Sequence, residues 1–147
     1  MGSLITLDAA GLSALSARLG SLSGSLSYPS HLMPATLPKR EAAVLLPLCM
    51  CDGEPSVLFT VRSALMTAHR GEVSFPGGHK DETDGTLEDA AVRETFEEVG
   101  ILPSNITILG SLPPLPNKGT TLSVYPFVGF VGAYAWHAQC ISVLTTV

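Results

Sequence analysis

The sequence predicts a single mixed α/β domain in which a sheet packs against one strongly marked helix. The chain has 147 residues with 46% hydrophobic side chains, which suits one globular domain with a substantial core. A helical pattern with a clear beginning and end lies between residues 86 and 101, and apolar runs typical of strands lie on both sides of it. Strands on both sides of one helix indicate an α/β sandwich with a mixed sheet.

The elements before that helix follow from local patterns. Leucines at helical spacing predict a short helix over residues 7–19, and the Ser, Gly and Pro content of residues 20–38 is typical of a linker. Apolar runs then flank the dipeptide Asp52-Gly53. Because this dipeptide favours a two-residue turn, we expect a β-hairpin there.

The central helix is predicted over residues 87–99. Thr86 and Asp89 resemble the start of a capping box, and Gly100 suits the left-handed position that ends many helices. Two further strands are expected after it, near residues 105–112 and 121–131, with a proline-rich loop between them.

The two faces of this helix are expected to differ, with an apolar stripe toward the core and carboxylates on the other side. The stripe is Val92, Phe96 and Val99, and the carboxylates are Glu94, Glu97 and Glu98. Glu94 and Glu98 form a like-charged i,i+4 pair near the negative end of the helix dipole, and Arg93 relieves this only in part by pairing with Glu97. The residues leave two interpretations open: a solvated helix face, or a site for a divalent cation such as Mg²⁺ or Mn²⁺, which prefers oxygen ligands.

Charge is distributed unevenly along the chain. The net charge is −5, yet nine of the thirteen acidic residues lie within residues 72–98, and none follows Glu98. A basic footprint is missing, so we expect no nucleic-acid partner. Gly77 and Gly78 precede the helix and would let the backbone approach a phosphate or a metal closely. The basic residues further upstream, Arg62, His69 and Arg70, suit the phosphates of a pyrophosphate ester.

Cysteine usage and the chain ends predict an intracellular protein, with cytoplasm, mitochondrion and peroxisome left open. Cys49, Cys51 and Cys140 are an odd number without zinc-ligand spacing, which favours reduced thiols. The first residues do not resemble a secretory signal. Residues 119–147 carry no charge, but Pro and Gly interrupt them, so we expect a buried strand and a loose terminus rather than a membrane-spanning tail. The oligomeric state is left open.

One segment is similar to a known family motif. The run Gly78 to Ile101, containing Arg93-Glu94-Thr95-Phe96-Glu97-Glu98-Val99-Gly100, resembles the Nudix box of the Nudix hydrolase superfamily. The segment before it resembles the signature of the coenzyme A diphosphatase branch, through Leu58-Phe59-Thr60-Val61-Arg62-Ser63, Gly71 and Phe75-Pro76-Gly77-Gly78. The resemblance covers about residues 40–131. It implies a Nudix domain over residues 39–132, after an N-terminal helix and linker over 1–38 and before an atypical C-terminal tail over 133–147.

The resemblance implies a fold and an activity. The fold would be a Nudix-like α/β/α sandwich with a mixed sheet, incomplete at its C-terminal end. The activity would be metal-dependent hydrolysis of the diphosphate bond of coenzyme A or its derivatives, giving 3′,5′-ADP and 4′-phosphopantetheine. Two alternatives are kept: hydrolysis of another nucleoside diphosphate derivative, such as ADP-ribose or a dinucleotide, and a truncated, inactive Nudix domain that binds without turnover.

The resemblance also assigns roles to residues. The metal ligands for Mg²⁺ or Mn²⁺ would be Glu94 and Glu98, with Glu97 as an additional ligand or a water-orienting carboxylate. Arg93 would hold the glutamates in place, so the catalytic group is Arg93, Glu97 and Glu98. The substrate-binding residues would be Arg62, His69, Arg70, Gly77 and Gly78. The general box has a glutamate where this chain has Gly85, and neighbouring Asp84 is expected to take part of its role.

Overall fold

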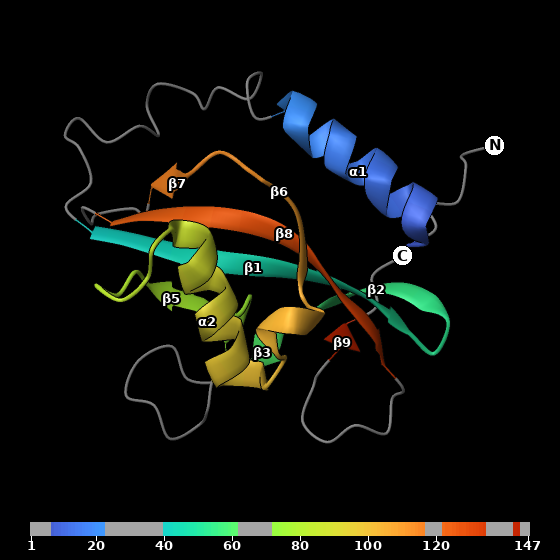
Figure 1. Ribbon diagram of the computed structural model, residues 1–147. Helices are drawn as coiled ribbons and strands as arrows, with labels where there is room; N and C mark the ends of the chain where they lie inside the picture. The colour runs from blue at the N-terminus through green and yellow to red at the C-terminus, as the bar shows by residue number, and fades with distance from the viewer. Residues whose placement is uncertain (1–6, 23–39, 62–71, 117–121, 135–142, 145–147) are drawn as a thin grey trace.

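The structure is a computed structural model that describes residues 7–22, 40–61, 72–116, 122–134 and 143–144. A β-sheet lies between two helices, α1 (Ala9–Leu22) and α2 (Leu87–Val99) (Figure 1). The core residues of α1 and α2 pack against opposite faces of the sheet. The predicted α/β sandwich is confirmed.

The sheet is mixed, as predicted. Its strand order is β6-β8-β1-β2-β9, with β5 beside β1 and β7 beside β8. The strands are β1 (Arg40–Cys51), β2 (Glu54–Leu58), β5 (Gly77–His79), β6 (Thr107–Ser111), β7 (Leu115–Pro116), β8 (Leu122–Tyr134) and β9 (Val143–Leu144). β1 and β8 run parallel, and the other pairings are antiparallel. A separate two-stranded sheet joins β3 (Thr60–Val61) to β4 (Val73–Ser74).

β1 and β2 form the predicted hairpin. Its turn residues Asp52 and Gly53 both have positive φ angles, 49° and 85°. A two-residue turn of this hand needs φ above zero at both positions, which is why Asp-Gly favours it. The local sequence therefore sets this part of the register, in which Cys51 pairs with Glu54.

One face of β1 is buried beneath α2, and residues on the other face are partly buried on the side of the sheet that carries α1. On one face, the core cluster contains Ala43, Leu45 and Cys49 of β1 with Ala90 and Ala91 of α2. On the other face, Leu46 and Leu48 of β1 pack with Leu19 of α1. A strand covered on both faces has a nearly continuous apolar sequence, which explains why β1 lacks a polar alternation.

Helix α1 begins two residues later than predicted and ends three residues later. Asp8 caps its start, since an Asp8 carboxylate oxygen accepts a hydrogen bond from the Gly11 N–H at 2.8 Å. Ser16 Oγ donates to the Leu109 carbonyl at 2.7 Å, and Leu19 is 6% exposed. A Cβ atom at Gly110 would come within 2.8 Å of Leu19, so the glycine lets α1 pack directly on β6.

The bounds and both ends of α2 agree with the prediction. The Thr86 side chain accepts a hydrogen bond from the Asp89 N–H at 3.1 Å, and the Asp89 carboxylate accepts one from the Thr86 N–H at 2.9 Å, which completes a capping box. Gly100 is left-handed, with φ of 73°, and its N–H donates to the Phe96 carbonyl. Local side-chain chemistry therefore decides where this helix begins and ends.

The predicted core face of α2 is wrong in part. Phe96 is 44% exposed and Val92 is partly buried, whereas Val99, also partly buried, packs against the core as predicted. The buried residues are instead small: Ala90, Ala91 and Thr95. Small side chains let the helix come close to the sheet, and Thr95 is buried at no polar cost because its hydroxyl donates to the Ala91 carbonyl at 2.7 Å.

Because Ala90, Ala91 and Thr95 form the buried face of α2, two of the glutamates lie elsewhere than predicted. At about 100° per residue, Glu94 and Glu98 lie roughly 60° and 20° from Ala91 around the helix axis. They are therefore beside the buried face rather than opposite it, and α2 contacts β5 as well as β1. The carboxylates consequently meet the sheet edge formed by β5.

The remaining segments differ from the prediction in detail. Leu115 and Pro116, expected in a loop, pair with β8 as β7. Part of the tail expected to be a loose terminus forms β9, which pairs with β2. Cys49 and Cys51 are free and buried, and burial raises the pKa of Cys49 to about 11, so its thiol is neutral and unreactive. Cys140 lies outside the described residues. Among the helices described, none is long and apolar enough to cross a membrane.

Candidate active site

A cavity of about 500 Å³ lies at the edge of the sheet where α2 passes β5. This volume is within the range of roughly 300–1,000 Å³ that is usual for small-molecule sites. The lining residues come from four elements and the turn after β5: Ala42, Val44, Gly77, Gly78, His79, Lys80, Asp81, Arg93, Glu94, Glu98 and Val124. Five of the residues predicted from the sequence are therefore brought together here: Gly77, Gly78, Arg93, Glu94 and Glu98.

The two glycines of β5 allow the α2 carboxylates to reach the sheet edge. A Cβ atom at Gly78 would overlap the Glu94 carboxylate, and one at Gly77 would overlap the backbone of β1. The Gly77 N–H donates a hydrogen bond to a Glu98 carboxylate oxygen at 3.3 Å. Backbone and carboxylates thus approach each other only because both positions lack side chains.

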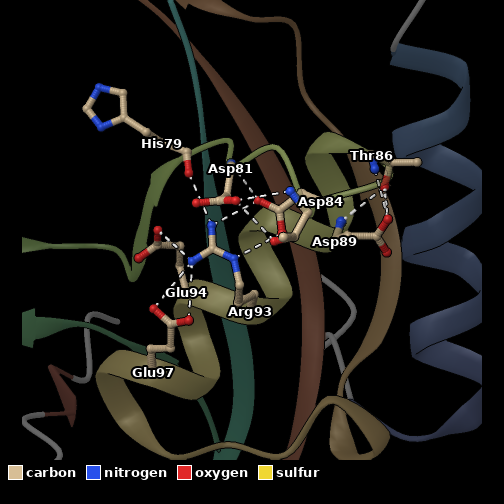
Figure 2. A network of polar contacts seen from close by, with 9 residues as sticks. His79, Asp81, Asp84, Thr86, Asp89, Arg93, Glu94 and Glu97 are labelled. Carbon is tan, nitrogen blue, oxygen red and sulfur yellow. Dashed lines mark hydrogen bonds and ion pairs between the residues drawn. The ribbon is translucent and has the colours of Figure 1, made fainter.

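Arg93 is the centre of a polar network, which Figure 2 shows. Its Nε and Nη2 atoms donate to the two carboxylate oxygens of Asp84, each at 2.9 Å. Its Nη1 atom donates to Glu94 at 3.0 Å and to Glu97 at 3.3 Å, and Nη2 also donates to the His79 carbonyl at 3.1 Å. The guanidinium thereby ties α2 to the segment that connects it with β5.

Asp84 fixes one side of this network. Its side chain is 4% exposed, and besides Arg93 it accepts a hydrogen bond from the Asp81 N–H at 2.8 Å. The hydrogen bonds from Arg93 hold the pKa of Asp84 below its usual value, and the same contact raises the pKa of Arg93. Asp84 thus forms an ion pair with Arg93, and its part in the role of the glutamate absent at Gly85 stays a prediction.

We expect the stability of the domain to fall as the pH drops below about 4. The lowered pKa of folded Asp84 means that its stabilising effect is fully present above the pKa of the unfolded carboxyl and is lost as the pH falls through the folded pKa. Asp81 acts in the same direction, because hydrogen bonds from Thr83 lower its pKa. Urea unfolding between pH 3 and 7 would measure this, and Asp84→Asn should show a weaker dependence. An equally steep dependence in Asp84→Asn would contradict the assignment.

The three glutamates predicted as metal ligands are placed differently from one another. Glu94 and Glu98 line the cavity, whereas Glu97 turns toward Arg93 with its side chain 54% exposed. In the described ranges, no group of three or more His, Cys, Asp or Glu side chains is arranged to hold a metal ion. Mg²⁺ commonly takes one or two carboxylates together with water and substrate phosphates, and two glutamates beside a glycine backbone fit such a site. The ligand roles stay predictions.

The other side of the cavity is apolar. Ala42 and Val124 are register partners on β1 and β8, and Val44 is two residues further along β1. These positions share the sheet face that carries α1, since Leu46 continues the same alternation and packs there. The cavity therefore extends around the β5 edge, from the α2 carboxylates to a small apolar surface on the opposite face of the sheet.

The segment upstream of the cavity is partly described. The rings of Phe59 and Phe75 stack with centroids 4.7 Å apart, and Thr60 donates to the Ser74 carbonyl at 3.1 Å, so the chain is held close to β5. The predicted phosphate contacts Arg62, His69 and Arg70 lie outside the described residues. Sequence reasoning missed Lys80 and Asp81, which line the cavity; their position directly after the Gly-Gly pair was the available signal.

Comparison with known protein families shows to which family the chain belongs. Residues 38–131 match the family model described as the NUDIX domain. The chain belongs to the Nudix hydrolase superfamily. The cavity that joins Gly77, Gly78, Glu94 and Glu98 thus lies within the Nudix domain, and the predicted family is confirmed.

Curated relatives of this Nudix domain have similar sequences. The chain is 44% identical over 108 residues to the uncharacterized Nudix hydrolase NudL of Pectobacterium atrosepticum, covering 74% of this chain and 55% of that protein. It is 45% identical over 95 residues to NudL of Klebsiella aerogenes, covering 65% and 78%. Nudix hydrolase 3 of Caenorhabditis elegans is 44% identical over 89 residues, covering 60% and 37%. The chain spans about half the length of the Pectobacterium protein and of the NudL proteins of two Klebsiella pneumoniae strains.

Solved structures show the same fold. A Nudix hydrolase of M. smegmatis, RenU, superposes with a TM-score of 0.56 at 21% identity, covering 74% of this chain and 72% of that one. The C. elegans Ap4A hydrolase gives a TM-score of 0.53 at 22% identity, covering 71% and 78%. At these identities the similarity concerns the fold alone, and it agrees with the Nudix-like sandwich predicted from the sequence.

Proposed function

We propose that this Nudix domain hydrolyses, with a divalent metal ion, the diphosphate bond of coenzyme A or a coenzyme A derivative, giving 3′,5′-ADP and 4′-phosphopantetheine. The observation that carries the hydrolase proposal is that Glu94, Glu98 and the two β5 glycines line the same cavity. The choice of coenzyme A is supported by the signature before the box, whose Phe59 and Phe75 pack together just upstream of β5.

The metal site we propose consists of Glu94 and Glu98, with Glu97 as an additional ligand or a water-orienting carboxylate. Mg²⁺ or Mn²⁺ bound there would neutralise phosphate charge and lower the pKa of a coordinated water. Arg93 would position the carboxylates through its contacts with Glu94 and Glu97, and it is itself held by Asp84. Catalysis would then rest on positioning and charge stabilisation, as is usual for phosphoryl transfer.

The shape of the cavity suits a substrate with two chemically different parts. A diphosphate would lie at the β5 edge, where Gly77 and Gly78 leave room close to the backbone. A less polar part would lie on the surface formed by Ala42, Val44 and Val124. The upstream basic residues Arg62, His69 and Arg70 remain proposed phosphate contacts.

A substrate panel tests the proposal. The purified full chain would be incubated with Mg²⁺ or Mn²⁺ and coenzyme A, acetyl-coenzyme A, ADP-ribose or NADH, and the products separated by chromatography. We expect 3′,5′-ADP and 4′-phosphopantetheine, or its acyl form, from the first two compounds. Cleavage of ADP-ribose or NADH with coenzyme A untouched would show that coenzyme A is not the substrate and that the domain hydrolyses another nucleoside diphosphate derivative. Binding without turnover of any compound would instead indicate an inactive Nudix domain.

A further inference from the structure

A diphosphate in the cavity would carry several negative charges, which a cationic side chain can offset together with a metal ion. In the part of the chain that the structure describes, the Lys and Arg residues are Arg18, Arg40, Lys80 and Arg93. Two of these line the cavity, Lys80 and Arg93. The question is therefore which of the two has hydrogen-bond donors left for a phosphate.

Arg93 has none left. A guanidinium has five N–H donors. In Arg93, Nε and one donor of Nη2 go to Asp84, the second donor of Nη2 goes to the His79 carbonyl, and Nη1 serves Glu94 and Glu97 (Figure 2). A phosphate could reach this guanidinium only by displacing one of these acceptors, which are the buried Asp84 carboxylate, two further carboxylates and a backbone carbonyl. Arg93 is consequently a positioning residue.

Lys80 is in the opposite situation. Its side chain is exposed, lines the cavity and forms no ion pair with any residue of the described ranges. Its backbone is fixed, because its N–H donates to the Glu41 carbonyl at 3.1 Å in the turn that follows β5. Lys80 is also close enough to Asp84 for its charge to contribute, after that of Arg93, to the lowered pKa of that carboxyl.

We propose that Lys80 binds the substrate by donating from its ammonium group to a non-bridging oxygen of the diphosphate. This assignment rests on the proposed diphosphate hydrolysis and adds a contact to it. The ligand chemistry is a diphosphate ester, whatever groups are attached to its two ends. Lys80 is two residues from Gly78, and both line the cavity together with the α2 carboxylates Glu94 and Glu98. A strongly hydrated point charge on a flexible stem suits such a contact.

The test compares Lys80→Ala with Lys80→Arg. For Lys80→Ala we expect the KM for the hydrolysed substrate to rise roughly 10- to 100-fold, with a smaller change in kcat, which is the effect of losing one charge-assisted hydrogen bond. Lys80→Arg keeps the charge and should recover most of the affinity. The matched control is Arg18→Ala, which removes a positive charge that is also exposed from α1, outside the cavity lining, and should leave KM unchanged.

A binding measurement separates this proposal from the proposed function. Calorimetric titration of the full chain with methylene diphosphonate in the presence of Mg²⁺ needs no turnover, and Lys80→Ala should weaken the affinity by a similar factor. If wild type hydrolyses a substrate but Lys80→Ala matches Arg18→Ala in KM and in diphosphonate affinity, the Lys80 contact is wrong. If wild type hydrolyses nothing in the panel but Lys80→Ala still weakens diphosphonate binding, the hydrolase function fails and the contact stands.

Discussion

Replacing Glu98 by glutamine should lower metal-dependent turnover by more than about 100-fold while the domain stays folded, since even groups that only support metal ligands commonly contribute 10- to 100-fold. Glu98 lines the cavity, and its carboxylate accepts a hydrogen bond from the Gly77 N–H at 3.3 Å. The glutamine carbonyl can accept the same hydrogen bond, so the substitution removes charge and metal affinity but little structure. Product formation, Mn²⁺ binding and urea unfolding would be measured in parallel.

The stability change in this variant has a predicted sign. Glu98 and Glu94 are like charges near the negative end of α2, so without metal Glu98→Gln should be neutral or stabilising by roughly a few tenths of a kcal/mol. Glu88→Gln is the matched control, because it makes the same change in the first turn of α2, outside the cavity, and should retain full turnover. Wild-type turnover or wild-type Mn²⁺ affinity in Glu98→Gln would show that Glu98 is not a metal ligand.

Replacing Arg93 by leucine should destabilise the domain by about 3 kcal/mol, near the lower end of the cost of breaking a buried ion pair. The carboxylate of Asp84, whose side chain is 4% exposed, would lose both of its 2.9 Å hydrogen bonds from the guanidinium. The lower end applies because the Arg93 side chain itself is 27% exposed. Urea unfolding at pH 7 would measure the loss, and turnover should fall as well, since Glu94 and Glu97 lose their common partner.

A double-mutant cycle makes this prediction specific to the pair. Asp84→Asn together with Arg93→Leu should cost less than the sum of the two single changes, because each single change already breaks the contact. Arg93→Lys should be intermediate, since an ammonium cannot make the two parallel hydrogen bonds of a guanidinium. The exposed control Arg18→Leu should change stability by less than about 0.5 kcal/mol. Strict additivity of Asp84→Asn and Arg93→Leu would rule out the pair as the source of the stability.

Local sequence determined the secondary structure around the site. Helix α2 begins at the capping box of Thr86 and Asp89 and ends at the left-handed Gly100. The β1–β2 hairpin follows from the turn residues Asp52 and Gly53. The physical reason is that caps and tight turns involve neighbouring residues. The family motif added a set of site residues, five of which share one cavity in the structure.

Local sequence did not predict which face of α2 packs against the sheet. Hydrophobicity alone suggested that Phe96 faces the core, yet close packing against the sheet favours Ala90, Ala91 and Thr95. The face of a helix that is buried depends on how near the opposing backbone comes, which is a property of the whole sheet. As a result, Glu94 was predicted opposite the core but lies against Gly78.

The sequence by itself determined that this chain carries a Nudix box on a helix with defined ends, preceded by a glycine pair. Only the tertiary structure decided which groups share the cavity. Pairing of β1 with β8 and β5 brings Val124 and Gly78 to positions on either side of β1, although they are far apart in the chain. The contacts of Arg93 use all five of its N–H donors, whereas Lys80, the other described cation that lines the cavity, forms no ion pair within the described residues. Such non-local contacts depend on the register of the strands and the packing of the helix, and no short stretch of sequence encodes them.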